Sequence, residues 1–356
     1  MAARLGSSYT LESLVGRGAM GEVWRGHDQS GRAFAFKLLL PELTTDERIV
    51  ARFMRERSVL TRIQSPFVVQ VWDLVAEHGR LAIVMDFIEG SDLRRYLRSR
   101  GTLPPAEAVA LTVDILTGLG VAHALGIVHR DLKPANVMLD GSGPALHPKV
   151  TDFGIAGVMD SSTGLTSGEG VLGTPTYMAP EMIDGVGTGP PADVYAAGIM
   201  LYELISGVTP FIGPPVAVLR AHVDLLPGRP PGLDDALWAV VSAMLAKNPG
   251  DRPGVADLRA LQPSLAGRPA QPPLASPPLP VTTGPRPGPA DTADPSAATP
   301  PPAPAALHPA ASHPATSDPA ASKPATSDPS GSDLSASVPG PVPGRPDSPM
   351  ATTGSG

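Results

Sequence analysis

Cysteine is absent from this chain of 356 residues. Disulfide bonds, thiolate metal sites and cysteine nucleophiles are therefore excluded. Long apolar runs are absent as well, because none approaches the roughly 18–20 residues that a membrane-spanning helix needs. The first twelve residues, MAARLGSSYTLE, also lack the apolar core of a signal peptide. We expect a protein without a membrane span that acts in the cytoplasm.

Aromatic residues are scarce and unevenly placed, since they make up 4% of the chain and all lie before position 239. More than half of the 44 prolines lie after position 264, where Ala, Ser, Thr and Gly supply most other residues. Such a segment buries too little apolar surface to offset a loss of roughly 1–2 kcal/mol of backbone entropy per ordered residue. We predict one folded domain over residues 9–263 and a disordered tail over 264–356.

The tail contains a five-residue repeat over residues 308–332, with one proline in each unit. Regular prolines favour extended segments that are stiffer than a Gly/Ser linker. The repeat is either a spacer or docking and phosphorylation platform, or a low-complexity segment with no dedicated partner.

A basic stripe is also missing. The formal net charge is −7, and the tail contributes six acidic and four basic residues to it. Nothing in this distribution suggests binding to nucleic acid or to an anionic membrane surface.

Three glycines near the N-terminus, Gly16, Gly18 and Gly21, have the spacing G-x-G-x-x-G. Dinucleotide-binding folds use the same spacing, but at a turn from a strand into a helix. Here strand-like runs at 9–15 and 22–27 flank the glycines, which predicts a hairpin that lies over a ligand. Glycine suits such a loop because a Cβ would hold the backbone amides away from bound phosphates.

A single lysine, Lys37, interrupts the apolar strand-like run 33–40. This lysine either faces an anionic ligand or protects an edge strand against aggregation. Residues 45–63 have a helical apolar pattern, and two acids in it, Glu47 and Glu56, are candidates to pair with Lys37.

The most informative stretch is His129-Arg130-Asp131-Leu-Lys-Pro-Ala-Asn136, followed sixteen residues after the asparagine by Asp152-Phe-Gly. Phosphoryl transfer needs a carboxylate that orients the attacking hydroxyl and oxygen ligands that hold Mg²⁺ on the nucleotide. Asp131 suits the first role, and Asn136 and Asp152 suit the second. The glycine loop, the catalytic stretch and the Asp-Phe-Gly motif stand in one consistent order, which argues against chance.

With these motifs the chain resembles the protein kinases, and the Lys133-Pro134 pair is the Ser/Thr form of the catalytic loop. The resemblance covers residues 9–263 and is closest to bacterial eukaryotic-like Ser/Thr kinases. It implies an α+β, two-lobed fold, with a small antiparallel sheet and one helix in the first lobe and a mainly helical second lobe. It also implies transfer of the γ-phosphoryl group of ATP to Ser or Thr hydroxyls of protein substrates, with Mg²⁺ or Mn²⁺ as cofactor.

The resemblance assigns roles to individual residues. Asp131 would be the catalytic base, Lys133 would neutralise charge on the transferred group, and Asn136 and Asp152 would hold the metal. It implies that Asp92 accepts from the ribose, although an acid there could equally cap a helix. The residues expected around ATP are Val15, Gly16, Gly18, Gly21, Val23, Ala35, Lys37, Glu56, Asp86, Ile88, Asp92 and Met138.

The polar, Gly-rich run 160–170 matches the middle of a kinase activation segment. Arg130 is a cation placed to receive a phosphate from that loop. We expect autophosphorylation at Thr166 first, with Thr163 and Ser167 as second choices. Self-association for transfer between two copies would accompany it.

Three further residues resemble structural positions of the kinase family. Asp193 would hold the backbone of the catalytic loop, and Arg252 would pair with Glu181. We expect His123, within the helical run 105–125, to be a satisfied core histidine rather than a catalyst.

Two other functions differ from an active protein kinase in the motifs that they require. Small-molecule phosphotransferases of this fold typically read HGD in the catalytic loop and lack an Ala-Pro-Glu motif. This chain has the protein-kinase form of both, His129-Arg130-Asp131 and Ala179-Pro-Glu181. A pseudokinase, a scaffold that binds ATP and partners through its Pro-rich tail, is expected to have lost Lys37, Asp131 or Asp152. All three are present.

Overall fold

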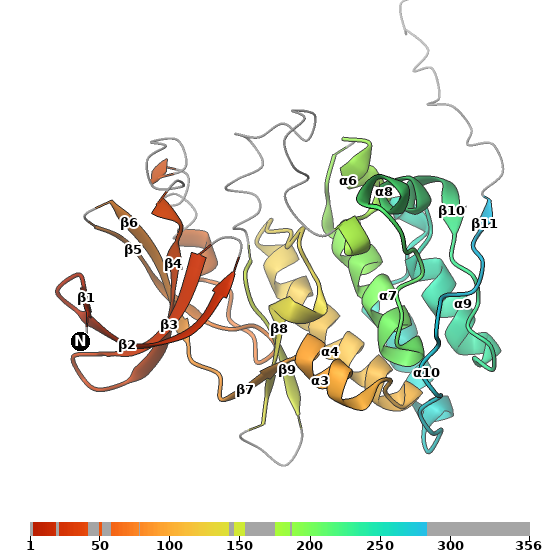
Figure 1. Cartoon of the computed structure of the whole chain (residues 1–356), viewed down its shortest axis with the longest axis horizontal. Helices are drawn as coiled ribbons and strands as arrows, with labels where there is room; N and C mark the ends of the chain where they lie inside the picture. The colour runs from red at the N-terminus through yellow and green to blue at the C-terminus, as the bar shows by residue number, and fades with distance from the viewer. Residues whose placement is uncertain are drawn as a thin grey trace, which may run out of the picture. The chain divides into compact units, whose positions relative to one another are not determined.

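The structure is a computed structural model that describes residues 3–18, 21–41, 50–51, 58–77, 79–141, 146–153, 175–185 and 187–282. In this part an antiparallel sheet forms an N-lobe and a mainly helical region forms a C-lobe (Figure 1). The two-lobed α+β class expected from the sequence is therefore confirmed.

The N-lobe sheet has the strand order β1-β2-β3-β4-β6-β5, and every neighbouring pair is antiparallel. The strands are β1 (Ala3–Leu5), β2 (Tyr9–Gly18), β3 (Gly21–Asp28), β4 (Ala33–Leu39), β5 (Val71–Glu77) and β6 (Arg80–Asp86). The hairpin predicted around the glycines is the β2–β3 hairpin.

Strand β4 shows how the sequence positions the site. Successive side chains of a strand point to opposite faces. Phe34 and Phe36 pack in one apolar cluster with Leu5 and Leu11, whereas Ala35 lies in a different cluster with Met85. Lys37 has the same parity as Ala35, so its side chain lies on the face away from the two phenylalanines.

Strand β1 extends the domain beyond the start expected at residue 9. It pairs with residues 9–11 of β2, and Leu5 is buried. Three residues are too few to show a strand periodicity, which is why the sequence pattern did not reveal β1.

The C-lobe is built around two long apolar helices, α4 (Pro105–Ala124) and α7 (Pro190–Ser206). The other helices are α3 (Leu93–Arg100), α6 (Pro180–Ile183), α8 (Pro215–Asp224), α9 (Asp235–Met244) and α10 (Val255–Leu265), with 3₁₀ turns η1 (Pro134–Asn136), η2 (Pro175–Tyr177) and η3 (Pro249–Asp251). The sequence predicted no run near the length of a membrane span, but among the described residues α4 alone is long and apolar enough to cross a membrane. Most of this helix is buried inside the C-lobe.

A small sheet of β7 (Gly90–Asp92), β8 (Val137–Asp140) and β9 (His147–Val150) carries the catalytic stretch. Strands β8 and β9 form a hairpin within the sixteen-residue spacing between Asn136 and Asp152. Strand β9 ends two residues before Asp152, so the hairpin brings the two predicted metal ligands to the same end.

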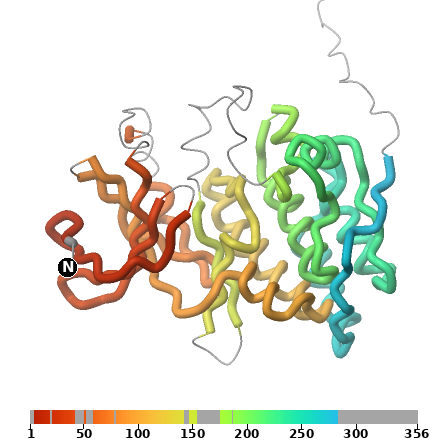
Figure 2. The backbone as a smooth tube through the Cα atoms, in the orientation of Figure 1, coloured from red at the N-terminus to blue at the C-terminus, as the bar shows by residue number. Residues whose placement is uncertain are grey.

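The C-terminal boundary expected at residue 263 falls inside α10. After α10 the chain stays on the C-lobe through residue 282 and ends in β11 (Val281–Thr282), which pairs with β10 (Leu225–Leu226) (Figure 2). The compositional prediction placed residues 264–282 in the disordered tail because they are rich in proline. Residues 283–356, including the repeat, lie outside the described residues.

Candidate active site

The three predicted catalytic-loop residues lie together. The Lys133 ammonium donates to Asp131 Oδ2 at 2.6 Å, and the Asn136 amide donates to the Asp131 carbonyl at 2.8 Å and to its Oδ2 at 3.1 Å. The Asp131 side chain keeps 28% of its surface exposed. The carboxylate is therefore fixed by two neighbours and still open to an incoming hydroxyl.

Asp193 holds the backbone that leads into this loop, as predicted. Its two carboxylate oxygens accept from the backbone N–H groups of His129 at 2.9 Å and Arg130 at 3.0 Å. Arg130 has a φ of 66°, a left-handed conformation that a bulky residue rarely adopts. The strained turn is stabilised because buried Asp193 satisfies both N–H groups.

His123 is confirmed as a satisfied core histidine, and its partner is Asp193. His123 Nε2 lies 2.7 Å from Asp193 Oδ2. This pairing was not predicted, because the two residues stand 70 positions apart.

Asp152 also has a left-handed backbone, with a φ of 67°. The preceding residue is fixed on both sides, because the Thr151 N–H donates to the Asn136 carbonyl at 2.9 Å and His129 Nε2 donates to the Thr151 carbonyl at 2.8 Å. The Phe153 ring packs edge-on against His129, with 4.8 Å between centroids. Asp152 is thereby tied to the loop that carries Asp131.

Lys37 and Asp152 form a direct ion pair across the two lobes, with 2.8 Å between Lys37 Nζ and Asp152 Oδ1. The Lys37 side chain is only 10% exposed. A central strand carries it, since β4 pairs with β3 and β6, so the edge-strand explanation is wrong. Glu56 lies outside the described residues, and its pairing with Lys37 stays a prediction.

The glycine loop has two kinds of glycine. A Cβ at Gly16 would meet no atom within 4 Å, and one at Gly18 would meet only the Gly21 carbonyl oxygen at 4.0 Å. At Gly21 a Cβ would lie 1.9 Å from the Leu38 carbonyl oxygen, and φ is 149°. Gly21 is thus required by strand pairing, a reason that the sequence did not reveal, and its contact with phosphate stays a prediction.

An apolar wall lies where the adenine is expected. Ala35 and Met85 pack with Val69, and Val23, Phe87 and Ile88 pack against them. Sequence reasoning missed Val69 and Phe87.

Asp86 and Ile88, two of the residues expected around ATP, differ in whether their backbone groups already form hydrogen bonds. The Asp86 N–H already donates to the Gln70 carbonyl, and the Asp86 carboxylate accepts from Trp72 and Arg32. Among the described residues no backbone hydrogen bond involves Ile88. The Asp86 N–H is therefore unavailable to a nucleotide, whereas the Ile88 peptide group is open to one.

Asp92 caps α3, since its Oδ1 accepts from the Arg95 N–H at 2.9 Å. The capping alternative is therefore confirmed, and contact with a ribose through the second oxygen stays a prediction. Met138, another residue expected around ATP, pairs with Asp92 in the β7–β8 ladder.

Asn136 and Asp152 fit a magnesium ion. The Asn136 nitrogen is used on Asp131, which leaves its amide oxygen free, and Asp152 has one oxygen on Lys37 and another available. Magnesium is usually held by one or two carboxylates together with substrate phosphates. The described residues contain no group of three or more acidic or histidine side chains that would hold a metal without such help.

Glu181 and Arg252 form the predicted pair. Arg252 donates to both carboxylate oxygens, at 2.5 and 2.7 Å, and also to the Ala246 and Pro191 carbonyls. The two side chains are 7% and 1% exposed. The pair therefore fixes α6 to the region around η3 in the interior.

The predicted phosphosites Thr163, Thr166 and Ser167 lie outside the described residues. The chain is described again from η2, where the Tyr177 hydroxyl donates to Glu203 on α7 at 2.6 Å. Burial raises the pKa of Tyr177 and also that of Glu203. Sequence reasoning did not find this contact, because neither residue belongs to a motif that it used.

His222 on α8 is a second buried group that sequence reasoning missed. Its Nδ1 lies 2.9 Å from the Tyr195 hydroxyl, and its ring packs edge-on against Tyr195 and Phe211. Burial, and then the charge of Lys247, lower the pKa of His222 to about 3. This histidine is therefore neutral at ordinary pH.

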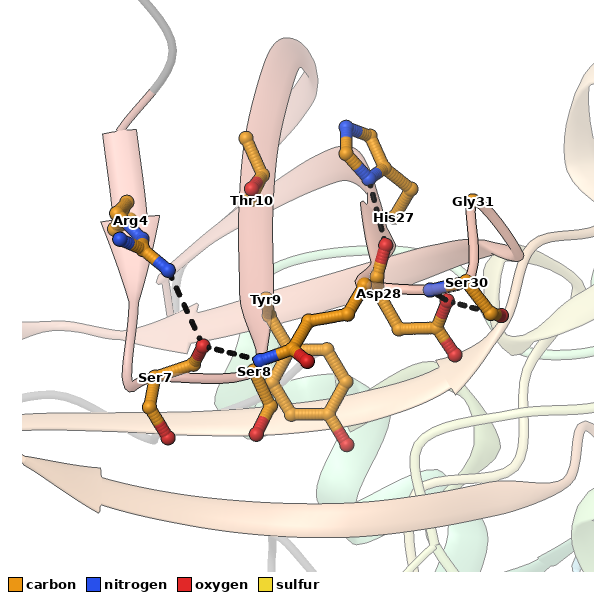
Figure 3. Close-up of a pocket in the computed structure, with 10 residues that line it drawn as sticks. Arg4, Ser7, Ser8, Tyr9, Thr10, His27, Asp28, Ser30 and Gly31 are labelled. Atoms are coloured by element: carbon orange, nitrogen blue, oxygen red, sulfur yellow. Dashed lines mark hydrogen bonds between the residues drawn. The ribbon is translucent and has the colours of Figure 1, made fainter.

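A hollow of about 300 Å³ lies elsewhere in the N-lobe, between the β1–β2 and β3–β4 turns (Figure 3). Its polar groups already bond one another: Arg4 donates to the Ser7 carbonyl, and the Ser30 N–H and hydroxyl donate to Asp28. It contains none of the predicted catalytic or nucleotide residues and is not the candidate active site.

Comparison with known proteins agrees with this geometry. Residues 9–262 match the family model described as the protein kinase domain. The chain belongs to the protein kinase family. Within that family it is a bacterial eukaryotic-like Ser/Thr member.

Similar relatives of this kinase chain carry the same family name. It is 48% identical over 267 residues to the serine/threonine-protein kinase PkaA of Streptomyces coelicolor, covering 71% of this chain and 49% of that protein. It is 43% identical over 277 residues to PkaB of the same organism, covering 75% and 66% respectively. The chain thus spans between about half and two thirds of the length of these relatives.

A solved structure shows the same fold. The kinase domain of Mycobacterium tuberculosis PknI matches with a TM-score of 0.57 at 28% identity, covering 73% of this chain and 97% of that domain.

Proposed function

We propose that this protein is an active serine/threonine protein kinase that transfers the γ-phosphoryl group of ATP to protein hydroxyls. One observation carries the proposal most strongly. Asp131, Lys133 and Asn136 are mutually bonded, while Lys37 and Asp152 are paired and tied to the same loop through Thr151. Positioned charges of this kind are the main catalytic device in phosphoryl transfer.

The reaction follows from these positions. The acceptor oxygen forms a bond to the γ-phosphorus as the bond to the β–γ bridging oxygen breaks, and ADP leaves. The hydroxyl proton passes to the Asp131 carboxylate, and Lys133 balances negative charge on the transferred group. Magnesium, when bound by Asn136 and Asp152, would neutralise charge on the phosphates. Lys37 would turn from Asp152 toward the α- and β-phosphates.

Two features support protein substrates. The chain has the Lys133-Pro134 form of the catalytic loop and the Ala-Pro-Glu motif, whose glutamate is buried on Arg252. Relatives that are 48% and 43% identical to the matched part of this chain are named serine/threonine-protein kinases. We place the activity in the cytoplasm, where ATP is supplied, and cell fractionation tests that location.

The direct test incubates purified protein with Mg²⁺, [γ-³²P]ATP and a generic basic protein, followed by phosphoamino-acid analysis. Label on serine or threonine is the expected result. A protein that binds ATP and transfers no label with Mg²⁺ or Mn²⁺ would instead be a pseudokinase, and the proposal would fail.

We further propose that the kinase phosphorylates its own activation segment at Thr166, with Thr163 and Ser167 as the next sites. A second copy would be the donor. Mixing wild-type protein with an Asp131→Asn variant distinguishable by mass tests this, because the inactive copy gains phosphate only by transfer between copies. Active protein without phosphate over residues 160–170 would refute it.

A further inference from the structure

Residues 268–282, here called the strap, lie beyond the end of the kinase family match at residue 262. Six of its fifteen residues are proline. Figures 1 and 2 show the strap running along the C-lobe from the end of α10 to β10, where β11 forms. Most of its side chains are exposed.

The first half of the strap is held by main-chain contacts. The buried Thr102 hydroxyl donates to the Gln271 carbonyl, and the Leu274 N–H donates to the Ser206 carbonyl at 2.9 Å. Pro273 lies over Gly207, where a Cβ would come within 2.8 Å of the proline Cβ.

The second half of the strap depends on a glycine whose conformation does not itself require glycine. A Cβ at Gly228 would lie 2.6 Å from the Leu279 carbonyl oxygen and 2.7 Å from that of Pro278. No positive φ occurs at Gly228. The close approach of the strap excludes a side chain there.

These contacts define a groove on the C-lobe, formed by residues 101–102, 206–207 and 225–228. The groove offers a hydroxyl and a carbonyl as hydrogen-bond partners to the backbone of a bound segment. Its glycines leave room for proline rings. It buries few side chains of the strap, and Leu279 and Val281 remain 89% and 60% exposed. A surface segment held by a few main-chain bonds opens at low free energy compared with the core.

We propose that this groove is a binding site for an extended proline-rich segment, and that the strap occupies it as a detachable ligand of the same chain. Proline-rich segments suit such a site because their backbone is already extended and loses little entropy on binding. Covalent linkage raises the local concentration of the strap to about millimolar, so the groove is filled in cis. This inference goes beyond phosphoryl transfer and does not rest on it.

Two substitutions in the full-length chain separate the groove from its ligand. Leu274→Pro keeps an extended backbone but removes the N–H that donates to Ser206, so it weakens the strap and leaves the groove intact. Gly228→Ala fills the groove and leaves the strap intact. Leu274→Ala, which keeps the N–H, and Gly120→Ala, where a Cβ meets no atom within 4 Å, are the matched controls.

The experiment measures binding of a fluorescent peptide of residues 268–282 by anisotropy, with thermal unfolding as the check of folding. The Leu274→Pro chain should bind the peptide about five- to tenfold more tightly than wild type, since one hydrogen bond of the competing strap is lost. Gly228→Ala should bind it no better than wild type, although hydrogen exchange of its residues 278–282 should rise.

Two results would overturn the proposal. One is folded Leu274→Pro protein that binds no more peptide than the Gly228→Ala chain. The other is unchanged hydrogen exchange of the strap in Gly228→Ala. Either result would make the strap a fixed part of the domain or a segment that does not use this groove. Neither readout uses kinase activity, so failure here is distinct from failure of the proposed function.

Discussion

At the scale of single residues, the active site depends on a few buried side chains whose hydrogen bonds fix the backbone of the catalytic loop. Asp193 is almost fully buried and accepts from two backbone N–H groups and from His123. The left-handed Arg130 and the partly exposed Asp131 follow directly from that anchor in the chain. A substitution at an anchor should therefore affect stability and catalysis together.

Asp193→Asn should test this link. The amide keeps the shape of the carboxylate but loses its charge and one acceptor, so a donor among the three partners is left unsatisfied. We expect the free energy of unfolding to fall by about 2–4 kcal/mol, measured in urea, together with phosphoryl transfer. Wild-type stability with wild-type turnover would contradict the anchoring role.

Arg252→Lys should be costly although it conserves charge. An ammonium cannot donate to both oxygens of Glu181 and also to two carbonyls from the fixed fork that Arg252 provides. We expect a loss of about 2–4 kcal/mol by chemical denaturation. Arg229→Lys is the control, because its partner Asp235 is 93% exposed and the pair should contribute under about 1 kcal/mol. Equal losses for the two variants would be inconsistent with this account.

At the scale of elements, the glycine motif of the β2–β3 hairpin serves two purposes. Gly21 allows strand pairing, and Gly16 leaves space in which we expect the phosphates of ATP. Gly21→Ala should disrupt the pairing of β3 with β4, because the new Cβ meets the Leu38 carbonyl. Gly16→Ala should leave the fold intact, because nothing lies within 4 Å, and should raise the KM for ATP if phosphates occupy that space. Thermal unfolding and ATP titration of both variants distinguish the roles, and a stable Gly21→Ala protein would count against the strand-pairing explanation.

The packing of α8 predicts a pH dependence of stability. The pKa of His222 is about 3 in the folded protein, below its ordinary value of 6.5. The unfolded chain therefore takes up a proton below pH 6.5 that the folded protein refuses, so stability is lost as pH falls from 6.5 toward 3.

His222→Gln removes this titration. Between pH 7 and pH 5 the stability of wild type relative to His222→Gln should fall by about 2 kcal/mol. Urea unfolding of the two proteins at a series of pH values measures the difference. Parallel stability curves would show that this histidine protonates equally in both states.

The sequence was informative where function constrains a short run of residues. The loop 129–136 and the run 152–153 could be assigned because their chemistry is written in neighbouring positions. Long-range pairs such as His123–Asp193 and Tyr177–Glu203 could not, since no periodicity links residues 70 or 26 positions apart. Strand β1 was not predicted for a different reason: three residues are too few to show a strand periodicity.

At the scale of the whole molecule, composition misplaced the C-terminal boundary. The strap reads as disordered because it is rich in proline, but it binds through its backbone, and a backbone ligand leaves no apolar signature. The residues that indicate the position of the strap are instead two glycines of the groove. Gly207 and Gly228 lie more than forty residues before the strap residues that they contact. A domain ended at residue 263 would omit the strap.

An ion pair between two of the predicted site residues joins the two lobes. Lys37 comes from the N-lobe sheet, and Asp152 follows the C-lobe hairpin, 115 positions later. The pair places a cation and a metal ligand beside the loop that carries Asp131. The central claim is that these groups act on one nucleotide and one hydroxyl.

The most direct measurement is the rate of ³²P transfer from [γ-³²P]ATP to a serine peptide by wild type and by Asp131→Asn, with ATP affinity measured in parallel. The account predicts that the rate falls by roughly 10²- to 10⁴-fold while ATP affinity is retained. A variant that transfers phosphate at the wild-type rate would contradict it.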